Sequence, residues 1–340
     1  MDIDIVFLWC DGDDPQIREK REFYLNNSQK EISLEAKAKG RFKNNDELKY
    51  ALRSVEKFAP FFRKIFIVTD NQVPSWLNTN HPKITIVDHK DIIPQEYLPT
   101  FNAYVIESFI HKIPDLSEHF VFANDDMFFT APCDESFFFD NQGHTIVYGK
   151  KTPDIKEIAK EKFLNKVKHL NYIYNCYVTL LLINKKLSKC KPFLPHHNID
   201  AYNKNAFIEV SKLLQDEYQA TYSHKFRELY DVSRLAAHSY EIENGKAVLH
   251  YVKRFSKKGL LFTPKFLINK YSKHYISIDM SLASLYDKGP TFRMKLLKKI
   301  SLGQIKLACF NDTQDVTDTH RDCFREFEEE LFPEKSSFEL

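Results

Sequence analysis

The chain has 340 residues, 43% of them hydrophobic and 14% aromatic, which is enough to bury a large core in one domain or two closely packed ones and argues against disorder. Its 49 Lys and Arg nearly balance its 47 Asp and Glu, so no overall basic field predicts a nucleic-acid partner. Only 8 glycines are present and no GxGxxG or GxxxxGK[ST] run occurs, which excludes the usual dinucleotide-binding and P-loop motifs.

The first 125 residues alternate between predicted strands and helices. Residues 3–9 (IDIVFLW) precede turn-prone Asp-Gly and Asp-Pro pairs and predict a central strand. Apolar residues at helical spacing predict a helix over 45–59, capped by Asn45 or Asp46 and ended by Pro60. Further strands are predicted at 65–69, 84–87 and 120–123. Such alternation is typical of an α/β fold with a mostly parallel sheet.

The middle of the chain is more helical and more charged. An apolar stripe from Ile155 to Val167 predicts an amphipathic helix there. Strand-like composition returns at 248–251, 276 and 307–310, before a last helix from about 319 to 331. We therefore expect an N-terminal α/β half over 1–149, a helical insertion over 150–245 that carries His and Arg site residues, and a C-terminal part over 246–340 that completes the same catalytic domain.

The cysteines and the amino terminus predict a cytoplasmic protein. The six cysteines are scattered without a CxxC pair, which fits a reducing compartment. Met1 is followed at once by the first predicted strand, with no signal-peptide pattern, and the longest apolar run, 178–184, is too short to span a bilayer. The basic and apolar stretch 252–266 could lie on anionic lipid at the inner face of the cell membrane, although a solvated loop is the simpler interpretation.

Four short polar clusters follow apolar runs. They are Asp11-Gly12-Asp13-Asp14, Asp70-Asn71-Gln72, Asn124-Asp125-Asp126 and Asn311-Asp312. Carboxylates held together repel one another unless water or a cation neutralises them, and the ends of strands in an open α/β sheet are common ligand sites. Strand-end turns and helix caps remain the alternative, least so for Asp125 and Asp126, which lie between two apolar runs.

Other polar residues allow two interpretations each. His196 and His197 can act as a general base or bind phosphate, but a histidine is more often structural. Lys225 and Arg227, near Asp231, suit a pyrophosphate and equally an ordinary surface ion pair.

Taken in order, four blocks resemble the Stealth family, bacterial capsular polysaccharide hexose-1-phosphate transferases that are similar to the animal enzyme attaching N-acetylglucosamine-1-phosphate to lysosomal glycoproteins. The first block is WCDGDDP (9–15) after its strand, and the second joins NDELKYALRSV (45–55), IVTDNQ (67–72), PSWL (74–77), PTFN (99–102) and NDDMF (124–128). The third is PHHNID (195–200) followed by KFR (225–227), and the fourth is FND (310–312).

The resemblance implies a nucleotide-sugar-transferase-like, Rossmann-related fold and a specific reaction. A UDP-linked hexose or N-acetylhexosamine would donate its sugar 1-phosphate to a hydroxyl of a glycan acceptor, possibly lipid-linked, in capsular or exopolysaccharide synthesis. A phosphodiester would form and the nucleoside monophosphate would leave. Because negative charge gathers on phosphoryl oxygens during such a transfer, catalysis should depend on positioning and on cations.

The resemblance also suggests roles for individual residues. It implies a Mg²⁺ or Mn²⁺ ion at Asp125, Asp126, Asn311 and Asp312, with Asp11 near it. Arg53 and Arg227 would clamp phosphates, because guanidinium offers bidentate contact. His197 is the candidate general base, with His196 as its rival. The donor would be contacted by Asp70, Gln72, Gly12, Asn102 and Asn45.

Two other functions remain open on the sequence. A conventional metal-dependent glycosyltransferase would also use a nucleotide sugar and an acidic motif, but it would release the nucleoside diphosphate. A non-catalytic glycan-binding protein on the same scaffold would bind the acceptor without turnover.

Overall fold

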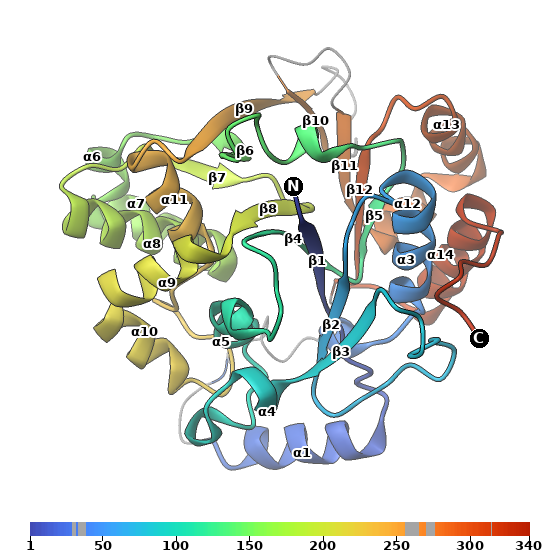
Figure 1. The fold of residues 1–340 in the computed structure, drawn as a ribbon, viewed down its shortest axis with the longest axis horizontal. Helices are drawn as coiled ribbons and strands as arrows, with labels where there is room; N and C mark the ends of the chain where they lie inside the picture. Colours follow the sequence, from blue (N-terminus) through green and yellow to red (C-terminus); the bar gives the residue numbers. More distant parts are fainter. Residues whose placement is uncertain (29–31, 33–38, 256–264, 270–275, 314) are drawn as a thin grey trace.

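Strands and helices are joined in an α/β fold in the computed structural model, which describes residues 1–28, 32, 39–255, 265–269, 276–313 and 315–340 (Figure 1). The strands are β1 (Ile3–Leu8), β2 (Ile65–Thr69), β3 (Ile84–Asp88), β4 (His119–Asn124), β5 (Met127–Phe129), β6 (Thr145–Lys151), β7 (Phe193–Pro195), β8 (Asp200–Asn203), β9 (Ala247–Phe255), β10 (Lys265–Asn269), β11 (Ile276–Ser281) and β12 (Leu307–Asn311).

Helices cover the strands and connect them. The α-helices are α1 (Pro15–Asn26), α3 (Glu47–Phe58), α4 (His89–Ile92), α5 (Ala103–Phe109), α6 (Ile155–Ile158), α7 (Glu161–Val167), α8 (Asn171–Leu187), α9 (Lys204–Leu213), α10 (Gln215–Tyr222), α11 (Leu235–Glu243), α12 (Leu282–Asp287), α13 (Gly289–Ser301) and α14 (Asp318–Leu331). Short 3₁₀ turns lie at η1 (Lys39–Phe42), η2 (Gln95–Tyr97), η3 (Ile110–Lys112) and η4 (Glu135–Phe137).

The first sheet has five strands in the order β3-β2-β1-β4-β8. Neighbours β3, β2, β1 and β4 pair in parallel, and only β8 at the edge is antiparallel. The prediction of a mostly parallel central sheet is therefore confirmed. Strand β8 has the polar sequence DAYN, without an apolar run, and the sequence did not predict it.

Both faces of this sheet are covered at its centre, which explains why the parallel strands β1, β2 and β4 are mostly apolar. Ile5 and Phe7 of β1 pack with Leu52 of α3 in one core, and Val6 packs with Val105 of α5 in another. Figure 1 shows α3 and α5 on opposite sides of β1. Helix α3 has the bounds predicted within two residues and buries the predicted apolar stripe.

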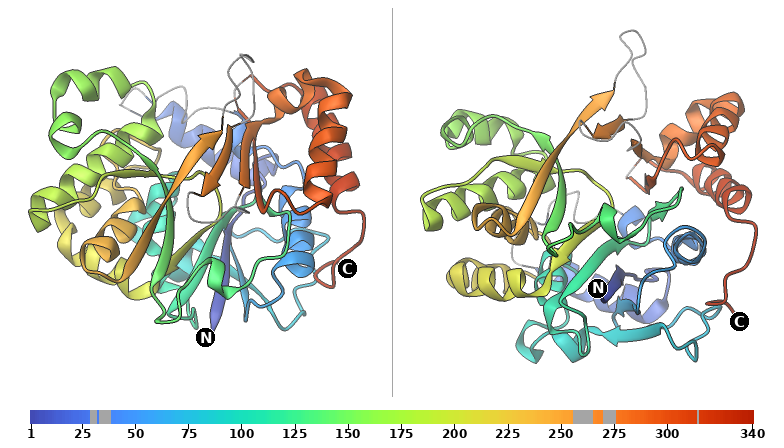
Figure 2. Two further views of the ribbon diagram at one scale, coloured as in Figure 1. Left: turned by 90° about the horizontal axis from the view of Figure 1, so that it is seen from above. Right: turned by 45° about the horizontal axis from the view of Figure 1, so that its top comes forward.

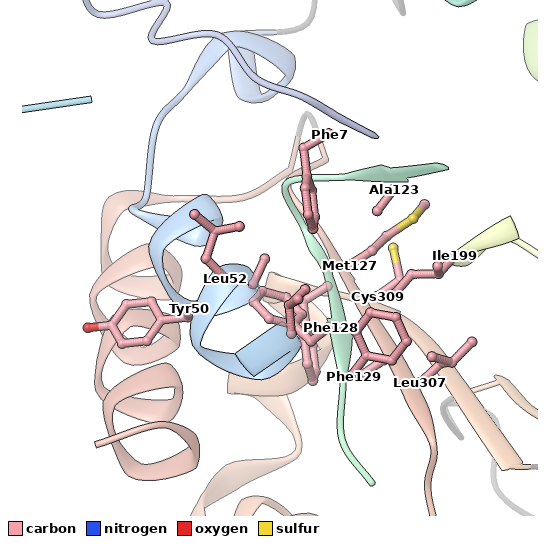
Figure 3. Packing of buried hydrophobic residues seen from close by; sticks show 14 of the residues in the cluster. Phe7, Tyr50, Leu52, Ala123, Met127, Phe128, Phe129, Ile199, Leu307 and Cys309 are labelled. Atoms are coloured by element: carbon pink, nitrogen blue, oxygen red, sulfur yellow. The ribbon is translucent and has the colours of Figure 1, made fainter. Parts of the chain in front are cut away.

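A second sheet of seven strands, in the order β5-β12-β11-β10-β9-β6-β7, adjoins the first. Strand β5 follows β4 after two residues and pairs antiparallel with β12, with Cys309 opposite Met127. Figure 3 shows these two sulfur-bearing side chains beside Phe128, Phe129 and Leu307 in the same core. The β5–β12 pair thus joins the end of the parallel sheet to the carboxyl-terminal part of the chain.

The two ends of the second sheet carry different helices. Helices α12, α13 and α14 lie at the β12 end and helices α6, α7 and α8 at the β6 and β7 end (Figure 2). The apolar stripe from Ile155 to Val167 is split between α6 and α7 rather than forming one helix. No helix within the described residues is long and apolar enough to cross a membrane. Most of the stretch 252–266, which the sequence assigns to a solvated loop with a lipid contact as the alternative, lies outside the described residues.

Glu241 on α11 gives the fold a testable pH dependence. Its side chain is 2% exposed and accepts a hydrogen bond from the Thr145 hydroxyl at 3.0 Å. Burial raises the pKa of Glu241 to about 8. The folded chain therefore keeps a proton that the unfolded chain releases near about pH 4.3, so this group's stability contribution is full below that pH and is lost as the pH rises through 8.

We expect Glu241→Gln to remove this loss, of which on the order of 3 kcal/mol falls between pH 6 and pH 9, because an amide cannot ionise. Urea unfolding at pH 6 and pH 9 measures the difference, with Glu96→Gln, at an exposed glutamate, as the matched control. An unchanged slope of stability against pH in Glu241→Gln would contradict the prediction.

Candidate functional site

Three of the predicted acidic clusters lie at one edge of the parallel sheet. Asp11 follows β1, Asp70 follows β2 and Asp125 follows β4, and the pairing of Leu8 with both Val68 and Asn124 brings these strand ends level. Cys10 lies among them: burial raises the pKa of its thiol to about 12, and the carboxylates of Asp125, Asp70 and Asp11 add to the rise. The edge is therefore strongly negative. Of these three carboxylates, only Asp70 has an ion pair among the described residues, with Lys20 Nζ at 2.7 Å.

Gln72 and Gly12 shape the loop after β1. The Gln72 side chain accepts a hydrogen bond from the Asp11 backbone N–H at 3.0 Å and donates to the Asp11 carbonyl at 2.9 Å. A Cβ at Gly12 would lie 2.1 Å from the Phe42 carbonyl oxygen, so only glycine lets η1 approach this closely. Both residues were predicted to contact the donor, and the structure gives each of them a role in holding the loop.

A cluster of buried carboxylates, which have no Lys or Arg ion pair among the described residues, lies behind this edge. Burial raises the pKa of Glu47 to about 7, with Asp126 adding to the rise. Burial, then Glu47 and Asp126, raise the pKa of Asp125 well above its ordinary value. Burial raises the pKa of Asp126 to about 6 although His197 opposes the rise, and its Oδ1 is buried with no hydrogen-bond partner among the described residues.

These carboxylates fit a hard divalent cation. Oxygen ligands are what Mg²⁺ and Mn²⁺ prefer, and a buried carboxylate oxygen without a donor is costly unless something neutralises it. Asp125 and Asp126 are the residues that would hold such an ion, and Glu47 is a neighbour that the sequence did not single out. Its signal was an acidic residue at the start of an otherwise apolar helix face.

Strand β12 brings the carboxyl-terminal cluster to the same place. The Phe310 backbone N–H donates to the Asp126 carbonyl at 3.1 Å, so Asn311 and Asp312 follow directly beside the β4–β5 turn. Arg321 binds both oxygens of Asp312, at 2.7 and 3.1 Å, and Asn311 donates to Asp279 at 2.9 Å. Both side chains therefore have protein partners in this structure. Direct metal contact by Asn311 and Asp312 stays a prediction.

Asn45 links this cluster to helix α3. Its side-chain amide donates to Glu47 at 2.6 Å and reaches Asp312 at 3.4 Å. A contact between Asn45 and the donor therefore also stays a prediction, since the amide is bonded to two carboxylates.

The two neighbouring histidines have different environments. His196 is fully buried and its Nε2 lies 2.8 Å from Asp200. His197 is 31% exposed, and its Nδ1 faces Asp279 at 3.5 Å and the Cys309 thiol at 3.7 Å. Of the two, only His197 combines access to solvent with contact to the acidic cluster. Neither Asp279 nor Cys309 was predicted, because strand pairing across β11 and β12 places them there.

Lys225 and Arg227 line a separate cavity of about 360 Å³ between α1 and the loop after α10, together with Phe23, Tyr24, His224 and Phe226. Lys225 donates to the carbonyls of Tyr97 and Leu98, and the Arg227 guanidinium lies over the Tyr104 ring. Within the described part of the chain neither cation pairs with a carboxylate, which leaves both available to an anion.

The predicted partner of this patch, Asp231, is occupied elsewhere. Its carboxylate accepts from Asn102 Nδ2 at 2.8 Å and pairs with His224 at 2.6 Å. Asn102 also caps α5 by accepting from the Tyr104 backbone N–H at 3.1 Å. The structure thus gives Asn102 a structural role in positioning the loop that carries Arg227.

Arg53 does not join the acidic cluster. Its guanidinium binds both oxygens of Glu339 at 2.8 Å and donates to the Phe332 carbonyl at 2.6 Å, so it fastens the carboxyl-terminal segment to α3. The carboxylate of this bidentate ion pair comes from a residue 286 positions away. A phosphate clamp at Arg53 stays a prediction, and the guanidinium would have to release Glu339 to form it.

We expect Arg53→Lys to lower the free energy of unfolding by about 1–3 kcal/mol, because an ammonium cannot keep the bidentate geometry at a site that is 7% exposed. Chemical unfolding of Arg53→Lys and of the exposed control Arg18→Lys measures the difference. A weakened donor affinity with unchanged stability would instead support the phosphate role.

Comparisons with known proteins were made by sequence and by fold. Residues 41–147 match the family Stealth protein CR2, conserved region 2. The matched region includes α3, Asp70, Asn102, Asp125 and Asp126. The capsular polysaccharide phosphotransferase Fcs1 of Haemophilus influenzae is 35% identical over 241 residues, 68% of this chain and 62% of the relative. Cps1A of Actinobacillus pleuropneumoniae, also named a capsular polysaccharide phosphotransferase, is 47% identical over 147 residues, 43% of this chain and 40% of the relative.

A mycobacterial protein and a solved structure complete the comparison. The exopolysaccharide phosphotransferase CpsY of Mycobacterium tuberculosis is 37% identical over 276 residues, 78% of this chain and 50% of the relative. The chain thus spans between 40% and 62% of the length of these three relatives. The galactosyltransferase LgtC, solved with donor and acceptor sugar analogs, matches 98% of this chain and 96% of its own with 10% identity and a TM-score of 0.42, and a likeness of that size carries no argument about function.

Proposed function

The chain belongs to the Stealth protein family, and from that premise we propose that it transfers a sugar 1-phosphate from a nucleotide-sugar donor to a hydroxyl of a glycan acceptor. The donor would be a UDP-linked hexose or N-acetylhexosamine, and the product a phosphodiester in capsular or exopolysaccharide synthesis. The three relatives are named capsular or exopolysaccharide phosphotransferases, which supports this reaction class.

One observation carries the proposal most directly: Asp125 and Asp126 are neighbouring buried carboxylates at the end of a parallel sheet, and neither has an ion pair among the described residues. The raised pKa values of both groups and the unpartnered Oδ1 of Asp126 support a cation site there. Asp125 and Asp126 would hold Mg²⁺ or Mn²⁺. A divalent ion bound there would neutralise the phosphoryl oxygens of the donor.

His197 would take the proton from the acceptor hydroxyl. With a proton on Nδ1, which faces the Asp279 carboxylate, Nε2 is the nitrogen free to accept another. Asp279 is itself held by Asn311 at 2.9 Å, so the carboxylate that orients the imidazole has a fixed position. In this pair His197 would be the general base, and Asp279 would be the positioning residue that orients its imidazole.

In the proposed reaction the acceptor oxygen forms a bond to the sugar-bearing phosphorus while the bond from that phosphorus to the bridging oxygen breaks. The electron pair leaves with the bridging oxygen on the nucleoside monophosphate, and the hydroxyl proton goes to His197. Arg227 and Lys225, which lack carboxylate partners among the described residues, would bind anionic groups of donor or acceptor.

The reaction is proposed to take place in the cytoplasm, at the inner face of the cell membrane if the acceptor is lipid-linked. All six cysteines are free thiols, which supports a reducing compartment.

A screen of UDP-, GDP- and CMP-linked sugars with Mg²⁺ and Mn²⁺ tests the proposal, with the nucleotide product identified by chromatography. We expect UMP from a UDP-linked donor in the presence of acceptor. Release of UDP would show a conventional glycosyltransferase, and acceptor binding without any nucleotide product would show a glycan-binding protein.

A further inference from the structure

Four side chains from distant parts of the chain converge beside the proposed Mg²⁺ position. His197 precedes β8, Asp279 lies on β11, Cys309 lies on β12 and Asp126 lies in the β4–β5 turn. One ligand atom each of His197, Asp279 and Cys309 lies within 4.8 Å of the other two. Within the described residues no other group of His, Cys, Asp and Glu comes together in this way.

The separations have the size of the edges of a zinc tetrahedron. Cys309 Sγ lies 3.7 Å from His197 Nδ1 and 3.7 Å from Asp126 Oδ2, and His197 Nδ1 lies 3.5 Å from Asp279 Oδ1. Tetrahedral zinc with bonds of about 2.3 Å to sulfur and about 2.0–2.2 Å to nitrogen and oxygen places its ligand atoms roughly 3.3–3.6 Å apart. Movements of about an ångström or less would therefore close His197, Asp279 and Cys309 around one ion. Asp126 contacts this group only through Cys309 and would need a larger movement to join it.

The chemistry of these donors selects a softer ion than Mg²⁺. Thiolate and imidazole are ligands for Zn²⁺, whereas Mg²⁺ takes oxygen. Asn311, bonded to Asp279 at 2.9 Å, is placed as an outer partner that fixes the carboxylate.

We propose that His197, Asp279 and Cys309 form a binding site for one Zn²⁺ ion beside the Mg²⁺ or Mn²⁺ position at Asp125 and Asp126, with water or the neighbouring Asp126 as the fourth ligand. Zinc at this site takes the Nδ1 of His197 and the Asp279 carboxylate that is proposed to orient the imidazole, and its charge lowers the basicity of Nε2. It would therefore inhibit the transferase, and this consequence alone rests on the proposed function.

Binding is tested on metal-free protein without any measurement of activity. Co²⁺ reports a cysteine ligand through a thiolate-to-cobalt absorption band in the near ultraviolet, and Zn²⁺ affinity follows from competition with a chromophoric chelator. We expect one Co²⁺ per chain with this band, displaced by Zn²⁺ and not by millimolar Mg²⁺. Cys309→Ser should lose the band and weaken zinc binding by roughly 100-fold, while the control Cys133→Ser, at another buried cysteine, keeps both.

A second variant protects the test against misfolding of Cys309→Ser. Asp279→Asn keeps the thiol, and we expect it to weaken zinc binding while the cobalt band persists at higher metal concentration. A band of equal strength and affinity in Cys309→Ser, or an affinity unchanged in both variants, would overturn the proposed site. Inhibition by Zn²⁺ at fixed Mg²⁺ is a separate measurement. If the protein binds zinc but has no transferase activity, the zinc site is supported and the proposed function is contradicted.

Discussion

Asp126→Asn is expected to lower nucleoside monophosphate release by on the order of 1,000-fold. The substitution removes the charge of a carboxylate whose Oδ1 lacks a partner and which we propose as a ligand of the divalent ion. Release of UMP at saturating donor, with Mg²⁺ and Mn²⁺ varied over a wide range, measures the effect. Partial rescue at high Mn²⁺ would identify the loss as one of metal affinity.

The fold should survive this change, because an amide does not carry the charge that burial disfavours at Asp126. The thermal midpoint of the metal-free variant is therefore expected to equal or exceed that of the parent. Asp216→Asn, at an exposed acid on α10, is the control for the same chemical change. Turnover retained within about tenfold would remove Asp126 from the metal site.

His197→Gln is expected to lower turnover by about 100- to 10,000-fold, the usual range for a general base. The pH profile of turnover is the sharper measurement: a general base gives the parent an acidic limb, and this limb should be absent from His197→Gln. Donor binding should change little, because the imidazole is proposed to act on the acceptor hydroxyl.

His196→Gln is the matched variant one residue away. Its partner Asp200 lies at 2.8 Å in a fully buried setting, so we expect a loss of about 1–3 kcal/mol in unfolding free energy with the acidic limb unchanged. If His196→Gln removed the limb and His197→Gln kept it, the two assignments would be exchanged.

Local patterns predicted the parts of the site that strand order alone determines. Apolar runs located β1, β2, β3 and β4, and parallel pairing then required Asp11, Asp70 and Asp125 to share one edge. The approach of Asn311 and Asp312 to Asp126 was expected only from the resemblance, since no local pattern indicates that β12 pairs with β5.

The partners of the polar side chains were predicted less well, because they depend on which distant segments pack together in the folded chain. Nothing in the sequence around Arg53 indicates that Glu339 binds it. Nothing around Asp312 indicates that Arg321 binds it either. Asp279 had a weak signal: it lies in the alternating run ISIDMS, where it stands on the polar side of β11. Such alternation predicts which side chains share one face of β11, but it does not predict which segment packs against that face.

The pairing of β5 with β12 also bears on how the protein is made. Cys309 and Asp126 are 183 positions apart, so at ordinary rates of translation β5 leaves the ribosome about 10–40 seconds before its partner strand. During that interval β5 has an open edge, an apolar sequence and no catalytic site beside it. We therefore expect a chain interrupted before β12 to carry the acidic residues that follow β1, β2 and β4 and to lack the β5–β12 pair that brings Asn311 and Asp312 beside them.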